Sequence, residues 1–170
     1  ISEPSLPPAA RDEIAEAVAA AAIKYFILRQ APGRNIIFDL TKSLSFEGDS
    51  GPYLQYTLVR AKSVLDKAQT LGLQPAVAPL SGDNLKGDLK LERLLHRFPE
   101  VARRAASDYA PQLLVTYLTD LAAMFNNFYA QEQIIGLDPG APYRLALTQA
   151  TAVVLANGLS LLAIPIPERM

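Results

Sequence analysis

The chain has 170 residues, half of them hydrophobic, and its 16 basic and 17 acidic side chains give a formal net charge of −1. This length fits one domain of ordinary size, or one domain with an attached piece of another. There is no cysteine, and His96 is the single histidine. Disulfides, thiolate zinc sites, cysteine nucleophiles and histidine-rich metal sites are therefore excluded, while the near-neutral charge permits an RNA partner without requiring one.

An apolar run covers residues 14–23, interrupted by Glu16 and preceded by Asp12 and Glu13. The run is too short to cross a bilayer and has no basic leader, so neither a membrane helix nor a signal peptide fits. We therefore expect a cytoplasmic protein without a membrane partner. The chain begins with Ile1 rather than methionine, which suggests a piece of a longer protein.

Apolar residues recur at helical spacing along most of the chain. The expected helices cover roughly residues 11–30, 52–72, 89–98, 99–108, 111–135 and 143–162. Proline and glycine predict a loop over 74–85 and a turn over 136–142. Only Ile36–Leu40 has the apolar run that a short strand needs. The fold class is therefore all-α, a helical bundle of five or six helices.

The helix that opens at Pro52 has two distinct faces at about 100° per residue. Its core stripe consists of Leu54, Leu58, Ala61, Leu65 and Ala68. Tyr53, Tyr56 and Arg60 share a second face, and two rings with an arginine fork are suited to binding unpaired bases. The same spacing also fits a packing role, in which the tyrosines contact a neighbouring helix and Arg60 pairs with a carboxylate. Spacing alone favours this packing role over base binding.

The long helix near residues 111–135 has a similar ambiguity. Its apolar stripe consists of Leu114, Leu118, Leu121, Phe125 and Phe128. Tyr129 stands beside this stripe, either as its edge or as part of a binding surface, whereas Asn126 and Asn127 lie off it and are expected to face solvent. In the last helix the core positions are Thr148, Ala152, Leu155, Leu159 and Leu162. Gly158 inside that helix requires close packing or a bend.

Several short motifs follow one another in a recognisable order. The longest runs from Ser45 to Tyr56 and reads SFEGDSGPYLQY, with Arg60 soon after it. The others are Ala22–Phe26, Phe38–Asp39, Phe98–Val101, Pro111, Asp120–Ala122, Phe125–Asn126, Phe128–Tyr129, Arg144–Leu147, Asn157–Leu159 and the terminal Pro167–Met170. This ordered set resembles the C-terminal region of arginyl-tRNA synthetases, which belong to the class I aminoacyl-tRNA synthetases. The resemblance covers essentially the whole chain and is least specific over residues 69–90.

Three positions depart from that family's pattern. Ala163 stands where the family commonly has glycine. The triplet at residues 57–59 replaces one that usually holds small residues and a histidine, and the lead-in at 141–143 is unusual. These differences affect packing and local contacts more than the assignment.

The resemblance implies a DALR-type anticodon-binding domain over residues 49–170, preceded by a connecting segment over 1–48 at the end of the catalytic region. It also implies roles for individual residues. Positions matching Tyr53, Tyr56 and Arg60 face the anticodon loop, and those matching Tyr129 and Met170 help to form the pocket for a splayed anticodon base. The face that carries Tyr53, Tyr56 and Arg60, on the helix that opens at Pro52, is then expected to be a binding surface.

The implied function is binding of the anticodon loop of arginine tRNA, beside the catalytic domain of the same parent chain. The parent would be an arginine–tRNA ligase of protein biosynthesis that uses ATP with magnesium. The sequence contains neither the family's His-Ile-Gly-His-like motif nor a glycine-rich phosphate loop or metal-ligand cluster. We therefore expect no catalytic residue, metal site, cofactor or DNA partner here, and no activity of this piece alone. The alternative is a helical protein–protein interaction module without RNA binding.

Overall fold

The computed structural model describes residues 7–33, 39–45, 48–77 and 89–170. Six helices and one single helical turn occur in these ranges. They are α1 (Pro8–Leu28), the turn α2 (Leu40–Ser43), α3 (Gly51–Thr70), α4 (Lys90–His96), α5 (Phe98–Ser107), α6 (Pro111–Gln131) and α7 (Ala141–Leu161). No strand is present among the described residues, which confirms the all-α prediction. The apolar run at 36–40 lies outside them apart from its last two residues, as does most of the predicted loop at 74–85.

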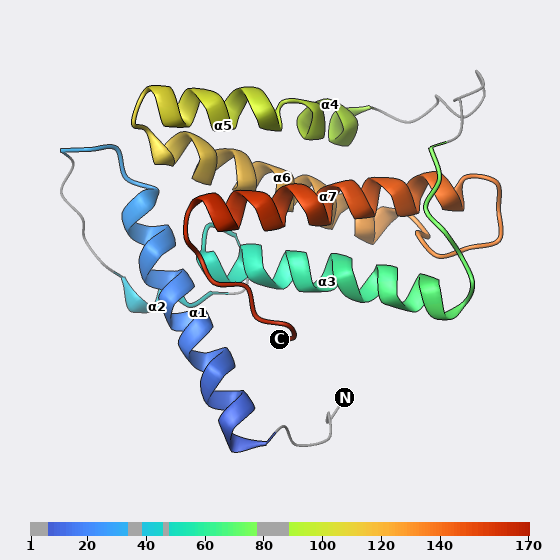
Figure 1. The fold of residues 1–170 in the computed structure, drawn as a ribbon, viewed down its shortest axis with the longest axis horizontal. Coiled ribbons are helices and arrows are strands. Elements are labelled where there is room, and N and C mark those ends of the chain that lie inside the picture. Colours follow the sequence, from blue (N-terminus) through green and yellow to red (C-terminus); the bar gives the residue numbers. More distant parts are fainter. Residues whose placement is uncertain (1–6, 34–38, 46–47, 78–88) are drawn as a thin grey trace.

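Helices α3, α6 and α7 form the centre of the bundle (Figure 1). Helices α4 and α5 lie along α6 at one edge, and α1 crosses the start of α3 at the other. The predicted stripes all point inward, because Leu54, Leu58, Leu118, Phe125 and Leu155 are completely buried. One apolar cluster includes residues of every helix except the turn α2, so the core is shared by the whole bundle.

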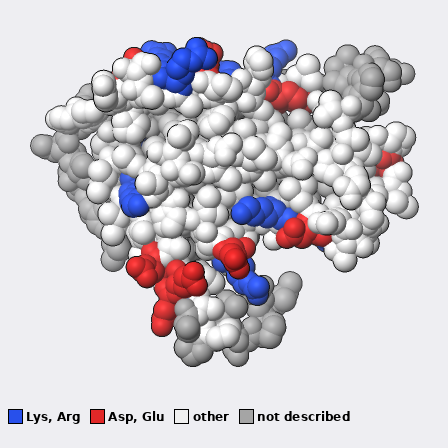
Figure 2. All heavy atoms as spheres, viewed as in Figure 1, with Lys and Arg blue, Asp and Glu red and all other residues white. Residues whose placement is uncertain are grey.

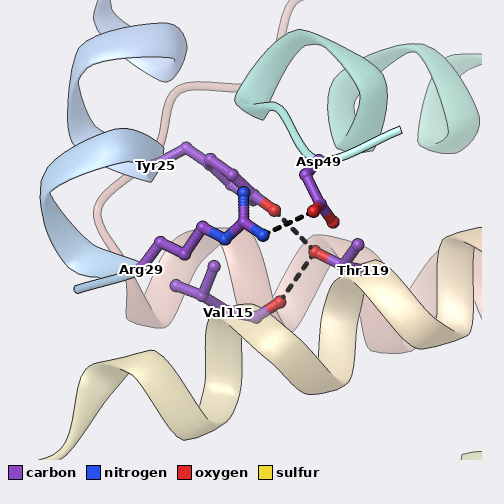
Figure 3. Close-up of polar contacts among 5 residues, drawn as sticks. All are labelled: Tyr25, Arg29, Asp49, Val115 and Thr119. Carbon is purple, nitrogen blue, oxygen red and sulfur yellow. Dashed lines mark hydrogen bonds and ion pairs between the residues drawn. The ribbon is translucent and has the colours of Figure 1, made fainter. Parts of the chain in front are cut away.

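Helix α1 is attached to the bundle at its C-terminal half. The backbones of α1 and α3 touch at Gly51, where an added Cβ would lie 2.2 Å from the carbonyl oxygen of Ala21. The buried Tyr25 hydroxyl is 2.9 Å from Oγ1 of Thr119 on α6, and burial is the main cause that raises the pKa of this tyrosine. Arg29 forms an ion pair with Asp49 just before α3 (Figure 3). These contacts fix the angle at which α1 leaves the core.

Gly158 is explained by close packing between α7 and α6. An added Cβ would lie 2.4 Å from Cδ2 of Leu118, which is itself completely buried. The glycine therefore lets the two central helices approach each other.

The tail after α7 turns back across α3 toward α1. Nε2 of the buried Gln55 donates to the carbonyl oxygens of Ala17 on α1, at 3.0 Å, and Pro165 in the tail, at 2.7 Å. Figure 1 shows the C-terminus beside the first half of α3. A single amide group thus ties α1, α3 and the tail together.

Three helices end in the same hydrogen-bonded cap, with a left-handed residue just beyond the helix. Gly72, Tyr109 and Ala163 have φ angles of 74°, 50° and 53°. In each case the next residue donates its N–H five residues back, as Ile164 does to Leu159 at 2.9 Å. Such caps favour glycine, because a Cβ is strained at positive φ. This accounts physically for the glycine expected in place of Ala163.

The contact between α1 and α3 predicts that Gly51→Ala lowers the free energy of unfolding by about 2 kcal/mol or more. The methyl group would meet a backbone carbonyl, which can move only with its helix. At Gly158→Ala the obstacle is a side chain, and the higher helix propensity of alanine offsets about 1 kcal/mol of the cost. Urea unfolding should therefore show Gly51→Ala as the more damaging change, and the reverse order would contradict this packing.

Replacing the two strained cap residues with glycine is expected to stabilise the chain. Ala163→Gly and Tyr109→Gly each remove a positive-φ side chain, a strain of about 1–2 kcal/mol, and lose part of this to the greater freedom of glycine in the unfolded chain. The Tyr109 side chain is 87% exposed, so its removal sacrifices little packing. We expect a net gain of about 0.5–1 kcal/mol each in urea unfolding, and a loss at both positions would refute the strain argument.

Candidate nucleic-acid interface

The face of α3 that carries Tyr53, Tyr56 and Arg60 packs against α6 and meets Tyr129 there. Ser50 caps the start of α3, since its hydroxyl accepts a hydrogen bond from the backbone N–H of Tyr53 at 3.1 Å. Cap and spacing together place the two tyrosines and the arginine on successive turns of one face. Four of the five predicted site residues are thus joined in one cluster.

Arg60 lies at the centre of this cluster. Its guanidinium carbon is 4.6 Å from the ring centroid of Tyr56 and 5.0 Å from that of Tyr129. Its Nη2 donates to the Tyr56 hydroxyl at 3.0 Å, and its Nη1 donates to Oδ1 of Asn126 at 2.7 Å. No ion pair to Arg60 is formed within the described part of the chain, so the carboxylate partner considered from the sequence is replaced by an amide.

Asn126 is the residue that sequence reasoning missed. It was expected to face solvent, but it is half-buried between α3 and α6. Its Nδ2 donates to the Tyr53 hydroxyl at 3.0 Å and to Oγ1 of Thr57 at 2.9 Å, while its Oδ1 accepts from Arg60. The available signal was its place three residues before Tyr129, which puts both on one side of α6. The expectation of exposure does hold for the neighbouring Asn127.

Tyr129 is both a core edge and a surface residue. Its ring centroid is 6.4 Å from that of the completely buried Phe125, yet 41% of the residue is exposed. One part of the ring therefore rests on the core while another remains open to a ligand. The core-edge alternative therefore applies to this side chain, and its part in a binding surface stays a prediction.

Met170 is half-buried at the end of the tail. No polar contact or ring contact joins it to the tyrosine-arginine cluster in the described ranges. The link between the tail and α3 is the Gln55–Pro165 hydrogen bond. A role for Met170 in the same site therefore stays a prediction.

Chemically, the cluster offers flat rings next to unused hydrogen-bond donors. A guanidinium has five N–H donors, and Arg60 spends two of them on described residues. Two aromatic rings fix its plane, so little rotational freedom remains to be lost when a ligand binds. Unpaired nucleic-acid bases have faces that stack on rings and edges that accept hydrogen bonds, and they match both features.

Other basic side chains are available on the surface. Those suited by exposure to contact phosphates include Lys62, Arg93, Arg97, Arg103 and Arg104. Arg104 is partly committed to Asp108, with Nε 3.4 Å from Oδ2. Figure 2 shows basic atoms along the edge formed by α4 and α5, and acidic ones near the start of α1. Since α4 and α5 lie on the other side of α6 from α3, most of these cations are separate from the cluster.

Comparison with known families identifies the domain. The model of the DALR anticodon binding domain matches residues 54–170. The chain belongs to this family. The matched range begins within α3 and includes every residue of the cluster except Tyr53.

The relatives of this DALR domain are consistent with that family. It is 39% identical to an arginine–tRNA ligase of Thermococcus kodakarensis, over 98% of this chain and 27% of the relative. It is 38% identical to an arginine–tRNA ligase of Streptococcus pneumoniae serotype 19F, over 94% of this chain and 28% of the relative. The solved arginyl-tRNA synthetase of Thermus thermophilus superposes with a TM-score of 0.78 at 34% identity, over 99% of this chain and 28% of that one. The chain thus spans little more than a quarter of the length of these proteins.

Arg144 holds the connection between α6 and α7 in the DALR domain. Its Nη2 is 2.6 Å from Oδ2 of Asp138, and its Nε donates to the carbonyl oxygen of Gln133 at 2.9 Å. This hydrogen-bonded guanidinium is the main cause that lowers the pKa of the Asp138 carboxyl. The connection between α6 and α7 is thereby held just beyond Tyr129.

Other kinds of site find no support in the described part of the DALR domain. It contains no group of three or more side chains that could hold a metal ion. None of its helices is long and apolar enough to span a membrane. His96 is an exposed residue at the end of α4.

Proposed function

We propose that this DALR domain binds the anticodon loop of arginine tRNA, as the tRNA-reading part of an arginine–tRNA ligase. The observation that supports this best is the Arg60 guanidinium held between the rings of Tyr56 and Tyr129. The proposed contact residues are Tyr53, Tyr56, Arg60, Tyr129 and Met170. Similarity to arginine–tRNA ligases along nearly the whole chain supports the choice of tRNA.

Binding would combine two kinds of contact. Stacking of an unpaired base on a tyrosine is worth about 1–3 kcal/mol, and hydrogen bonds from Arg60 to its edge would select the base. Phosphate contacts from exposed lysine and arginine add affinity that depends on salt but not on sequence. Because the net charge is only −1, binding should be weak by itself and strongly reduced by added salt.

The remainder of the proposed ligase would carry out the reaction. Activation of arginine with ATP and magnesium, and its transfer to tRNA, would take place in a catalytic domain of the same cytoplasmic protein. Residues 1–48 would connect that domain to the helical domain at 49–170. An uncovered apolar face on α1 supports such a neighbour, since Ile23 and Ile27 are each 49% exposed there.

The proposal predicts discrimination at the middle anticodon base. The chain should bind arginine tRNA at low salt more tightly than a tRNA changed at that base, as measured by fluorescence anisotropy. Tyr56→Ala and Arg60→Ala should each weaken cognate binding about tenfold or more, because each removes a stacking or edge contact.

Tyr109→Ala is the matched control for this titration, since it removes an exposed tyrosine beyond α5 and should leave the dissociation constant unchanged. Equal affinity for both tRNAs, or no binding to either, would contradict anticodon reading. Such a result would favour the protein-interaction alternative, with the tyrosine-arginine cluster as its docking surface.

A further inference from the structure

All the described hydrogen bonds of the Asn126 side chain are made to residues of α3, across the contact between α3 and α6 that we call the seam. A side-chain amide has two N–H donors, and both are used, for the Tyr53 hydroxyl and for Thr57. Its oxygen accepts from Arg60. A half-buried amide with no donor left is badly placed to read a base itself.

The orientation of this amide is determined by its partners. Thr57 donates its own hydroxyl hydrogen to the carbonyl oxygen of Tyr53 at 2.9 Å, so its Oγ1 can only accept from Asn126. An arginine N–H likewise can only donate. Rotating the amide by half a turn would place donor against donor at Arg60 and acceptor against acceptor at Thr57. One arrangement therefore satisfies the seam, and it points the oxygen at Arg60.

Arg60 depends on this oxygen for a fixed position. A free arginine side chain must lose rotamer entropy before its guanidinium can select a base edge. Tyr56 and Tyr129 hold the guanidinium through ring contacts, and the Tyr56 hydroxyl holds Nη2 from the same helix. Asn126 holds Nη1 from the neighbouring helix at 2.7 Å and thus fixes the rotation of the guanidinium.

We propose that Asn126 is a positioning residue for base selection, which holds Arg60 and Tyr53 in their binding geometry without contacting the RNA. This inference rests on the proposed function. It assigns the readout of the base to Arg60 and the accuracy of that readout to Asn126. The network already exists in the free protein, so binding would not have to assemble it.

A double-mutant cycle with Arg60 tests this role. Asn126→Ala should weaken binding of arginine tRNA about tenfold and reduce discrimination against a tRNA changed at the middle anticodon base. In the Arg60→Ala background the same change should have less than a threefold further effect, because the two residues act through one contact. The adjacent exposed Asn127→Ala is the matched control and should bind like the unmodified chain.

The outcomes separate the two proposals. If the unmodified chain discriminates between the tRNAs but the effects of Asn126→Ala and Arg60→Ala are simply additive, the positioning role is wrong and the proposed function stands. If Asn126→Ala weakens both tRNAs equally, a merely structural role replaces it. If the unmodified chain does not discriminate, both proposals fall.

Asn126→Asp provides a second variant if the alanine variant does not fold. The carboxylate keeps the shape and the acceptor for Arg60, but it cancels the charge of the guanidinium. It also removes the amide donors to the Tyr53 hydroxyl and to Thr57. Binding of arginine tRNA should therefore weaken, and discrimination at the middle anticodon base should fall. Affinity and discrimination equal to those of the unmodified chain would overturn the proposal.

Discussion

Helix α3 must satisfy three different neighbours at once, and the rest of the bundle depends on that constraint. Its leucines face the core shared with α7, Gly51 and Gln55 meet α1, and Tyr53, Thr57 and Arg60 face α6. A helix surrounded in this way would usually be apolar all round. Here the α6 seam is polar instead, and Tyr53, Thr57, Arg60 and Asn126 are hydrogen-bonded to one another or to Tyr56 there, which offsets the cost of burying them.

The polar seam joins stability and the proposed recognition in one set of contacts. The Tyr129 ring contacts the buried Phe125 and the guanidinium of Arg60, and these two contacts fix its position. Arg144 holds the chain immediately after α6. A ligand at this site therefore meets groups supported by two central helices rather than by a loop, which favours a precise geometry.

Much of this architecture follows from local chemistry. Prolines at the helix starts, glycine at a cap and the four-three spacing of leucines predict the helices and their buried faces, because each acts within one or two turns. The tyrosine-arginine face could be separated from the core stripe for the same reason. The burial of Asn126 could not be predicted in this way, because it depends on where α3 crosses α6. The spacing of residues within α6 carries no information about that crossing. For the same reason the sequence could not show that the partner of Arg60 is an amide rather than a carboxylate.

The bridge made by Gln55 has a consequence for the order in which the chain acquires its structure. Its partners Ala17 and Pro165 lie 38 residues before it and 110 residues after it. Contacts across such a separation form late, because a long loop must close first. During synthesis α1 and α3 emerge well before the tail, so the Gln55 amide cannot complete this bridge until residue 165 has been made. The corner where the tail crosses α3 is therefore among the last contacts of the bundle to form.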